Sequence, residues 1–251
     1  MATDVRALLM SLQLSDSAFP SGFYTMSHGL EGFSQARLVD HGGVVGLLRG
    51  LLRHGVGPGA PPPPPPAPPP GGGGGGGRGG PAPAPAGPHE AVVAGDWERV
   101  HQVDHLLFAT KLNAEMRRAS VRSGHQLTDV VGVAVGGPEI ARWAQGLAAK
   151  RSPGCQPVAT AVVYAATGVS TTAAVASDLA AFSMSVLGAA LRLRLADHRE
   201  VQVALHALAP VIEEVADEAV GRDLGDMGGC APMADVMSAQ HERAEARLFA
   251  S

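Results

Sequence analysis

The sequence is poor in aromatic residues, which make up 4% of its 251 residues, and it has two cysteines, Cys155 and Cys230. So few aromatic side chains leave little surface for stacking on bases. The formal net charge of −4 offers no basic surface for a phosphate backbone. Two cysteines cannot build a disulfide framework, which is typical of a protein of the reducing cytosol. We therefore expect no nucleic-acid partner and a cytoplasmic location.

Signals for export or membrane insertion are also missing. Asp4 and Asp16 lie in the first twenty residues, where a signal peptide would place a basic and then an apolar stretch. The longest uncharged run, residues 152–177, is interrupted by Gln156, Pro157 and Gly168. It is too polar for a span of roughly 20 apolar residues. We predict a protein without a membrane partner; a membrane-associated helical protein is the weaker alternative.

Residues 57–88 differ in composition from the rest of the chain. They hold 14 of the 20 prolines and 12 of the 33 glycines. Neither a stiff proline run nor a flexible glycine run can bury an apolar core, so this segment is predicted to be a disordered insertion. It is expected to be a tolerated loop expansion, with a ligand for a proline-recognising domain as the alternative. Residues 1–56 and 89–251 would then form one globular domain.

The apolar residues outside the insertion recur at helical spacing. Val5, Leu8, Leu9 and Leu12 follow the i, i+3, i+4, i+7 rule. Similar patterns predict helices over residues 44–52, 97–108, 158–166, 179–195 and 201–220, with glycine pairs at 136–137 and 228–229 marking ends. Residues 130–135 and 161–163 fit a short strand or a buried helix equally well. Because no segment shows convincing alternation, the predicted fold class is all-α.

No complete catalytic motif is present. The chain has no GxxxxGK[ST] phosphate loop and no GxSxG elbow, so it should neither hydrolyse nucleotides nor act through an activated serine. His101 and His105 lie four residues apart with Asp104 between them, a spacing that can place two imidazoles on one metal ion. No further ligand is evident beside them. A small helical metal-binding protein or metalloenzyme using these three residues is an alternative function.

Two segments are unusual in ways that helical periodicity does not explain. Residues 12–33 crowd small, polar and aromatic residues between two helical stretches, with Pro20 and Gly22 breaking the first. Residues 234–251 end in an apolar and basic tail. A free chain end is normally frayed, so this tail would need a surface to become ordered.

Both segments resemble the urease accessory protein UreF family. The N-terminal resemblance rests on Leu12, Gln13, Leu14, Ser15, Asp16, Ser17, Pro20, Gly22, Tyr24, Thr25, His28, Gly29, Leu30 and Glu31. The C-terminal resemblance rests on His241, Glu242, Arg247, Leu248, Phe249 and Ser251. A central stretch is similar to the family at Glu115, Arg117, Ala119, Ser120 and Gly124. The matches cover most of the chain outside the insertion, in the family's order.

The resemblance implies an all-helical, non-enzymatic chaperone. Such a protein would join UreD (also called UreH) and the GTPase UreG on apo-urease and regulate GTP-dependent nickel insertion. It would hold no tightly bound cofactor or resident metal and would handle nickel transiently, as a homodimer within the complex. The C-terminal tail residues are expected to bind UreD through Leu248 and Phe249, and the N-terminal motif to be an interface or a structural element.

Overall fold

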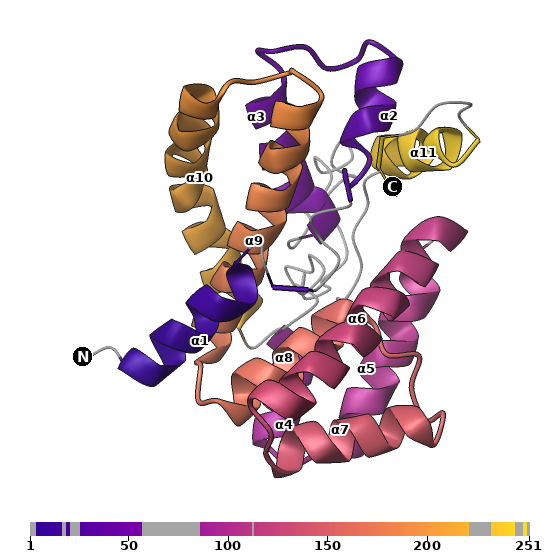
Figure 1. Cartoon of the computed structure of the whole chain (residues 1–251), viewed down its shortest axis with the longest axis vertical. Coiled ribbons are helices and arrows are strands. Elements are labelled where there is room, and N and C mark those ends of the chain that lie inside the picture. The colour runs from indigo at the N-terminus through magenta and orange to yellow at the C-terminus, as the bar shows by residue number, and fades with distance from the viewer. Residues whose placement is uncertain are drawn as a thin grey trace, which may run out of the picture.

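The computed structural model describes residues 4–16, 19–20, 26–56, 86–111, 113–220, 232–243 and 248–249. Within these ranges every regular element is a helix, which confirms the predicted all-α class (Figure 1). The elements are α1 (Val5–Ser15), α2 (Leu30–Gln35), α3 (Val44–Gly50), the π-helical turn η2 (Leu51–Val56), α4 (Ala86–Val93), α5 (Trp97–Thr110), α6 (Ala114–Ala134), α7 (Pro138–Ala148), α8 (Gln156–Ala166), α9 (Thr171–Arg192), α10 (His198–Ala219) and α11 (Pro232–His241).

One hydrophobic core forms where α9 and α10 pack against α3 and η2, in the upper part of Figure 1. Leu48, Leu52 and Leu187 are fully or almost fully buried there. The helix α10 begins at a capping box, in which the Asp197 side chain and Glu200 each bond the other's backbone N–H. A capping box satisfies backbone N–H donors that the first turn of a helix otherwise leaves without acceptors. The Asp197–Glu200 pair therefore sets where α10 begins after α9.

A second core lies among α4 to α8, in the lower part of Figure 1. The helix α8 is its centre, since every residue from Val158 to Tyr164 is buried. The helix α7 begins at Pro138, directly after the glycine pair predicted to end a helix. Trp143 of α7 is buried and donates its indole N–H to Thr128 Oγ1 of α6 at 3.1 Å. This polar contact lets a large ring be buried without an unsatisfied donor.

The helix α9 links the two cores, because Ala174 belongs to the lower cluster and Val175 to the upper one. It is the one described helix that is long and apolar enough to cross a membrane, and 56% of its most apolar window is buried inside the fold. Burial within the protein accounts for this composition, as it does in core helices of soluble proteins.

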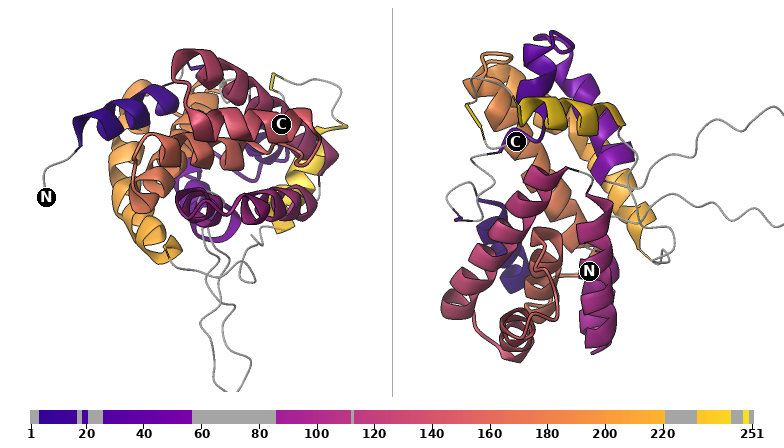
Figure 2. Two further views of the ribbon diagram at one scale, coloured as in Figure 1. Left: turned by 90° about the horizontal axis from the view of Figure 1, so that it is seen from below. Right: turned by 90° about the vertical axis from the view of Figure 1, so that its right-hand side faces the viewer.

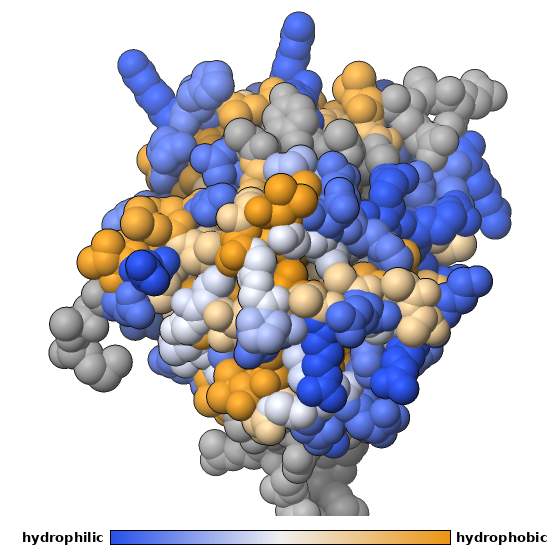
Figure 3. Space-filling model, turned by 60° about the horizontal axis from the view of Figure 1, so that its bottom comes forward, coloured by the Kyte–Doolittle hydropathy of each residue, from blue (hydrophilic) through white to orange (hydrophobic). Residues whose placement is uncertain are grey.

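The predicted N-terminal helix forms as α1, but its apolar stripe faces solvent. Val5, Leu8, Leu9 and Leu12 are 46–65% exposed, and apolar side chains gather over this helix on the face shown in Figure 3. The opposite side of α1 packs on α8 and α9, with Leu14 buried in the lower core. Periodicity therefore predicted the helix correctly but did not tell which face is covered.

Two details differ from expectation. The two strand candidates lie in or at the end of helices α6 and α8. The helix α4 begins at Ala86, so residues 86–88 belong to a helix and not to the predicted insertion; residues 57–85 lie outside the described residues.

Candidate functional site

The buried carboxylate of Glu31 holds the C-terminal segment against α2. Its Oε2 accepts a bond from His241 Nε2 at 2.7 Å and one from the Phe249 N–H at 3.1 Å. Its Oε1 accepts the Leu248 N–H at 2.9 Å. Glu31 is 3% exposed, so these bonds form away from water, where charge-assisted bonds are strongest. The two segments that the sequence singled out separately thus meet at one side chain.

Gly32 allows the same two helices to touch backbone to backbone. A Cβ on Gly32 would lie 2.6 Å from the Met237 carbonyl oxygen of α11, closer than side chains are found. The further views in Figure 2 also place α11 beside α2. Any side chain at position 32 would push α11 outward and stretch the Glu31–His241 bond.

The start of α6 reaches α11 from the other side. Asn113 caps α6 through its Oδ1 and donates from its Nδ2 to Ser238 Oγ at 3.3 Å. One turn further on, Arg118 pairs with Glu242 at 3.1 Å. The N-terminal, central and C-terminal segments that resemble one family therefore converge around α11. We call the residues that join them the tail clasp: Glu31, Gly32, Asn113, Arg118, Ser238, His241, Glu242, Leu248 and Phe249.

The structure corrects the expectation for Phe249. Its ring is buried in the upper core, with the Arg192 guanidinium carbon 4.3 Å from the ring centre. The bond from its N–H to Glu31 directs the ring inward, where an apolar side chain is favoured. Leu248, in contrast, is 74% exposed. Of the predicted tail, Leu248 alone is described with a large apolar side chain in solvent; Arg247 and Ser251 lie outside the described residues.

Of the rest of the N-terminal motif, His28, Gly29 and Leu30 lie where α2 begins and pack against the upper core. Gly29 has φ of +88° and Leu30 is buried in the upper core, so the glycine turns the chain into α2. The His28 ring packs edge-on against Phe182 of α9, and its Nε2 lies 3.0 Å from Ser185 Oγ. Pro20 is exposed, and Gly22, Tyr24 and Thr25 lie outside the described part of the chain.

Burial, with a smaller contribution from the charge of Lys111, lowers the pKa of His28 from 6.5 to about 4. The folded state therefore holds this histidine neutral, whereas the unfolded chain takes up a proton below pH 6.5. Lowering the pH reduces the stability of the fold wherever the unfolded state binds more protons than the folded state does.

We expect the free energy of unfolding to decrease as the pH falls from 6.5 towards 4, because the unfolded chain gains a proton on His28 that the folded chain does not. The His28→Asn variant should show a smaller dependence on pH over this range. Urea unfolding at pH 7.5 and 5 measures both. His206→Asn, at an exposed position on α10, is the control and should retain the wild-type slope. Equal slopes for His28→Asn and the wild type would contradict the prediction.

The predicted metal ligands of α5 do not converge. The Asp104 carboxylate points inward and accepts the N–H groups of Gly154 and Cys155, at 2.6 and 2.8 Å. Asp104 is fully buried and does not line the depression that His101 and His105 share, so its carboxylate does not face the two imidazoles' side of the helix. The hypothesis of a site containing His101, Asp104 and His105 is therefore wrong in its acidic ligand.

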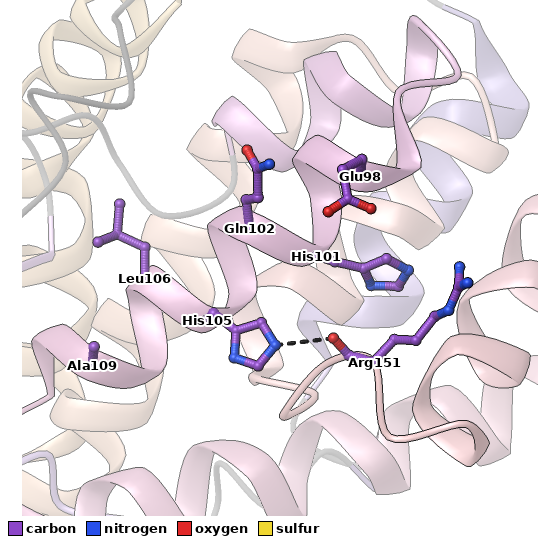
Figure 4. Close-up of a pocket in the computed structure, with 7 residues that line it drawn as sticks. All are labelled: Glu98, His101, Gln102, His105, Leu106, Ala109 and Arg151. Carbon is purple, nitrogen blue, oxygen red and sulfur yellow. Dashed lines mark hydrogen bonds between the residues drawn. The ribbon is translucent and has the colours of Figure 1, made fainter.

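The two histidines do share a surface depression of about 630 Å³, shown in Figure 4. His105 donates its Nε2–H to the Arg151 carbonyl at 2.9 Å, and His101 Nδ1 lies 2.7 Å from Ser152 Oγ. Burial is the main cause that lowers the His101 pKa. Among the described residues, no three His, Cys, Asp or Glu side chains are placed to hold a metal ion.

Comparison with known proteins shows which family this chain belongs to. A family model described as UreF matches residues 80–209. Three relatives named urease accessory protein UreF, from Yersinia pseudotuberculosis serotype IB (strain PB1/+), Yersinia pestis (strain Pestoides F) and Yersinia enterocolitica serotype O:8 / biotype 1B (strain NCTC 13174 / 8081), are each 30% identical over 97% of this chain and 98% of their own length. The chain belongs to the UreF family of urease accessory proteins.

In this UreF-family chain, several residues of the tail clasp were not predicted from the sequence. Gly32 carries a weak signal, because a glycine inside a helix lowers helix stability and so requires a packing reason. The Asn113–Ser238 bond and the Arg118–Glu242 pair join residues more than a hundred positions apart, and no local pattern marks them. Only the tertiary structure brings them together.

The described cysteine of this UreF-family chain is a structural thiol. Cys155 is fully buried, and burial together with the charge of Asp104 raises its pKa to about 12. A thiol in that state is a poor nucleophile and metal ligand. Cys230 lies outside the described residues.

Proposed function

We propose that this chain is a non-enzymatic scaffold that joins UreD and the GTPase UreG on apo-urease and regulates GTP-dependent nickel insertion. Membership of the UreF family supports the role in urease maturation. Nickel is the cargo of the complex, handled transiently, and the scaffold works as a homodimer in the cytoplasm. The absence of a phosphate loop from the sequence supports a division of labour in which UreG hydrolyses the nucleotide.

The observation that carries this proposal is the exposed apolar surface formed by Leu248 of the tail clasp and its neighbours on α11. Met233 and Val236 of α11 are exposed, and Leu248 is the most exposed of the three. The backbone bond to Glu31 fixes Leu248 in place, so a partner would not need to order the chain at that point. An apolar side chain presented in this way favours binding of UreD at the C-terminal segment.

We expect Leu248→Asp to abolish urease activation in cells that lack the native gene and to weaken binding to purified UreD by about tenfold or more, since burying a leucine contributes about 2 kcal/mol. The circular dichroism spectrum should be unchanged because Leu248 does not belong to the core. This variant is sharper than removal of residues 247–251, which would also delete the buried Phe249 ring.

Val133→Asp, at the exposed end of α6, is the matched control and should activate urease as the wild type does. If Leu248→Asp binds UreD as tightly as Val133→Asp, the tail is not the UreD site. If the wild-type chain fails to restore urease activity with all cognate partners present, the proposed function itself is wrong.

A further inference from the structure

A second surface feature, distinct from the exposed tail, lies between the end of α5 and the start of α6. It is a depression of about 450 Å³ lined by Phe108, Ala114, Arg117, Arg118, Val121 and Arg122, which we call the arginine groove. Among the described residues that line it, three are cationic, three are apolar and none is acidic. Such a combination is unusual in a chain with a formal net charge of −4.

The three arginines differ in how far their charges are engaged. Arg117 donates from Nη1 to the Lys111 carbonyl at 2.6 Å, and its guanidinium carbon lies 5.8 Å from the Phe108 ring centre. Arg118 pairs with Glu242, yet its side chain remains 68% exposed. Arg122 is exposed and has no hydrogen bond or ion pair with any described residue. The groove therefore offers two cationic groups to solvent beside a fixed third.

The existing contact with Glu242 shows which group this surface accepts. A carboxylate that follows the last residue of α11 binds Arg118 at the edge of the groove. Guanidinium groups match carboxylates in geometry and charge. The same groove is lined by three apolar residues, Ala114, Val121 and the exposed Phe108. Such a lining favours an aliphatic or aromatic side chain next to the acid.

We infer that the arginine groove binds an acidic segment of a partner protein, in which a carboxylate side chain lies beside an aliphatic or aromatic one. The inference rests on the proposed function only in taking that partner from the urease-maturation proteins. A protein segment fits better than a nucleic acid, because three arginines are few for a phosphate backbone. Arg117 also lies over the Phe108 ring on which a base would have to stack.

The test is Arg122→Glu in the full-length chain. Calorimetric titration with purified cognate UreD, UreG and apo-urease, each added separately, should show one partner bound about tenfold or more weakly, because a like charge facing the acidic segment repels it. Wild-type binding of that partner should weaken as salt is raised from 50 to 300 mM, values chosen to span about a twofold change in screening length. Arg122→Lys should keep most of the affinity.

Arg199→Glu makes the same charge change at an exposed position on α10, on the other side of the molecule from α6 (Figure 1), and should bind all three partners normally. An acid-to-arginine change in the bound partner segment that restores affinity to Arg122→Glu would locate the contact. Unchanged binding of all three partners to Arg122→Glu overturns the inference. A single-stranded oligonucleotide is titrated in the same way, and the inference is also overturned if Arg122→Glu loses binding to the oligonucleotide but to none of the three proteins.

The two proposals fail in different ways. If the wild-type chain does not restore urease activity in cells, the proposed function is wrong, whatever the groove binds. If the wild-type chain restores activity and Arg122→Glu matches it in both activity and partner affinity, the groove inference alone is wrong. A fall in the melting temperature of Arg122→Glu, absent in Arg199→Glu, would assign Arg122 to folding and overturn the inference.

Discussion

The Gly124→Ala variant should lose about 3 kcal/mol of its free energy of unfolding or fail to fold, because overpacking a tight contact costs about that much. A Cβ at Gly124 of α6 would overlap the Gly154 carbonyl oxygen and lie 2.8 Å from the Gln156 nitrogen. All the nearest atoms belong to backbone, so no side-chain rotation relieves the overlap.

The backbone that would have to move is held in place. The N–H groups of Gly154 and Cys155 both bond the buried Asp104 carboxylate of α5. A shift of this segment would break two charge-assisted bonds and leave a buried charge unsatisfied. The separation of α6 from α8 would have to increase instead, which opens the lower core.

Gly132→Ala is the matched control, since Gly132 lies on the same helix with nothing within 4 Å of an added Cβ. There alanine should stabilise the protein by about 0.5–1 kcal/mol through its higher helix propensity. Thermal and urea unfolding of both variants measure the contrast. Equal stability of the two would show that α6 and α8 are less closely packed than this structure has them.

Glu31→Ala should lower the free energy of unfolding by about 3–5 kcal/mol or detach the C-terminal segment, because each buried donor that loses its acceptor costs about 1–3 kcal/mol. The lost carboxylate would leave three donors without their acceptor: His241 Nε2 and the N–H groups of Leu248 and Phe249. The rate of amide hydrogen exchange should then increase more in α11 than in the other helices, and binding to UreD should weaken.

Glu242→Ala removes a carboxylate from the same segment at a more exposed position. Its pair with Arg118 has side chains 35% and 68% exposed, and such pairs contribute about 0–1 kcal/mol. This variant should therefore unfold close to the wild type, with α11 still protected from exchange. Similar losses in the two variants, or an unprotected α11 in both, would mean that Glu31 does not hold the tail.

Local chemistry in the sequence determined most of the helices. Apolar spacing predicted α5, α8, α9 and α10, and the glycine pair at 136–137 predicted the break that follows α6. These elements follow from interactions between residues three or four positions apart, which a linear pattern contains. The motif segments at both ends were also visible, because their composition departs from that periodicity.

The partners of those segments were decided by tertiary structure alone. The alternative of a metal site placed Asp104 beside two histidine ligands, whereas in the structure it fixes the loop before α8. Phe249 was expected in a partner and instead enters the upper core, while Leu248 next to it stays outside. Adjacent residues receive opposite environments because Glu31, far away in the chain, bonds both of their backbone N–H groups and sets which side chain turns inward. A contact between residues about two hundred positions apart has no local signature, so only the folded chain reveals it.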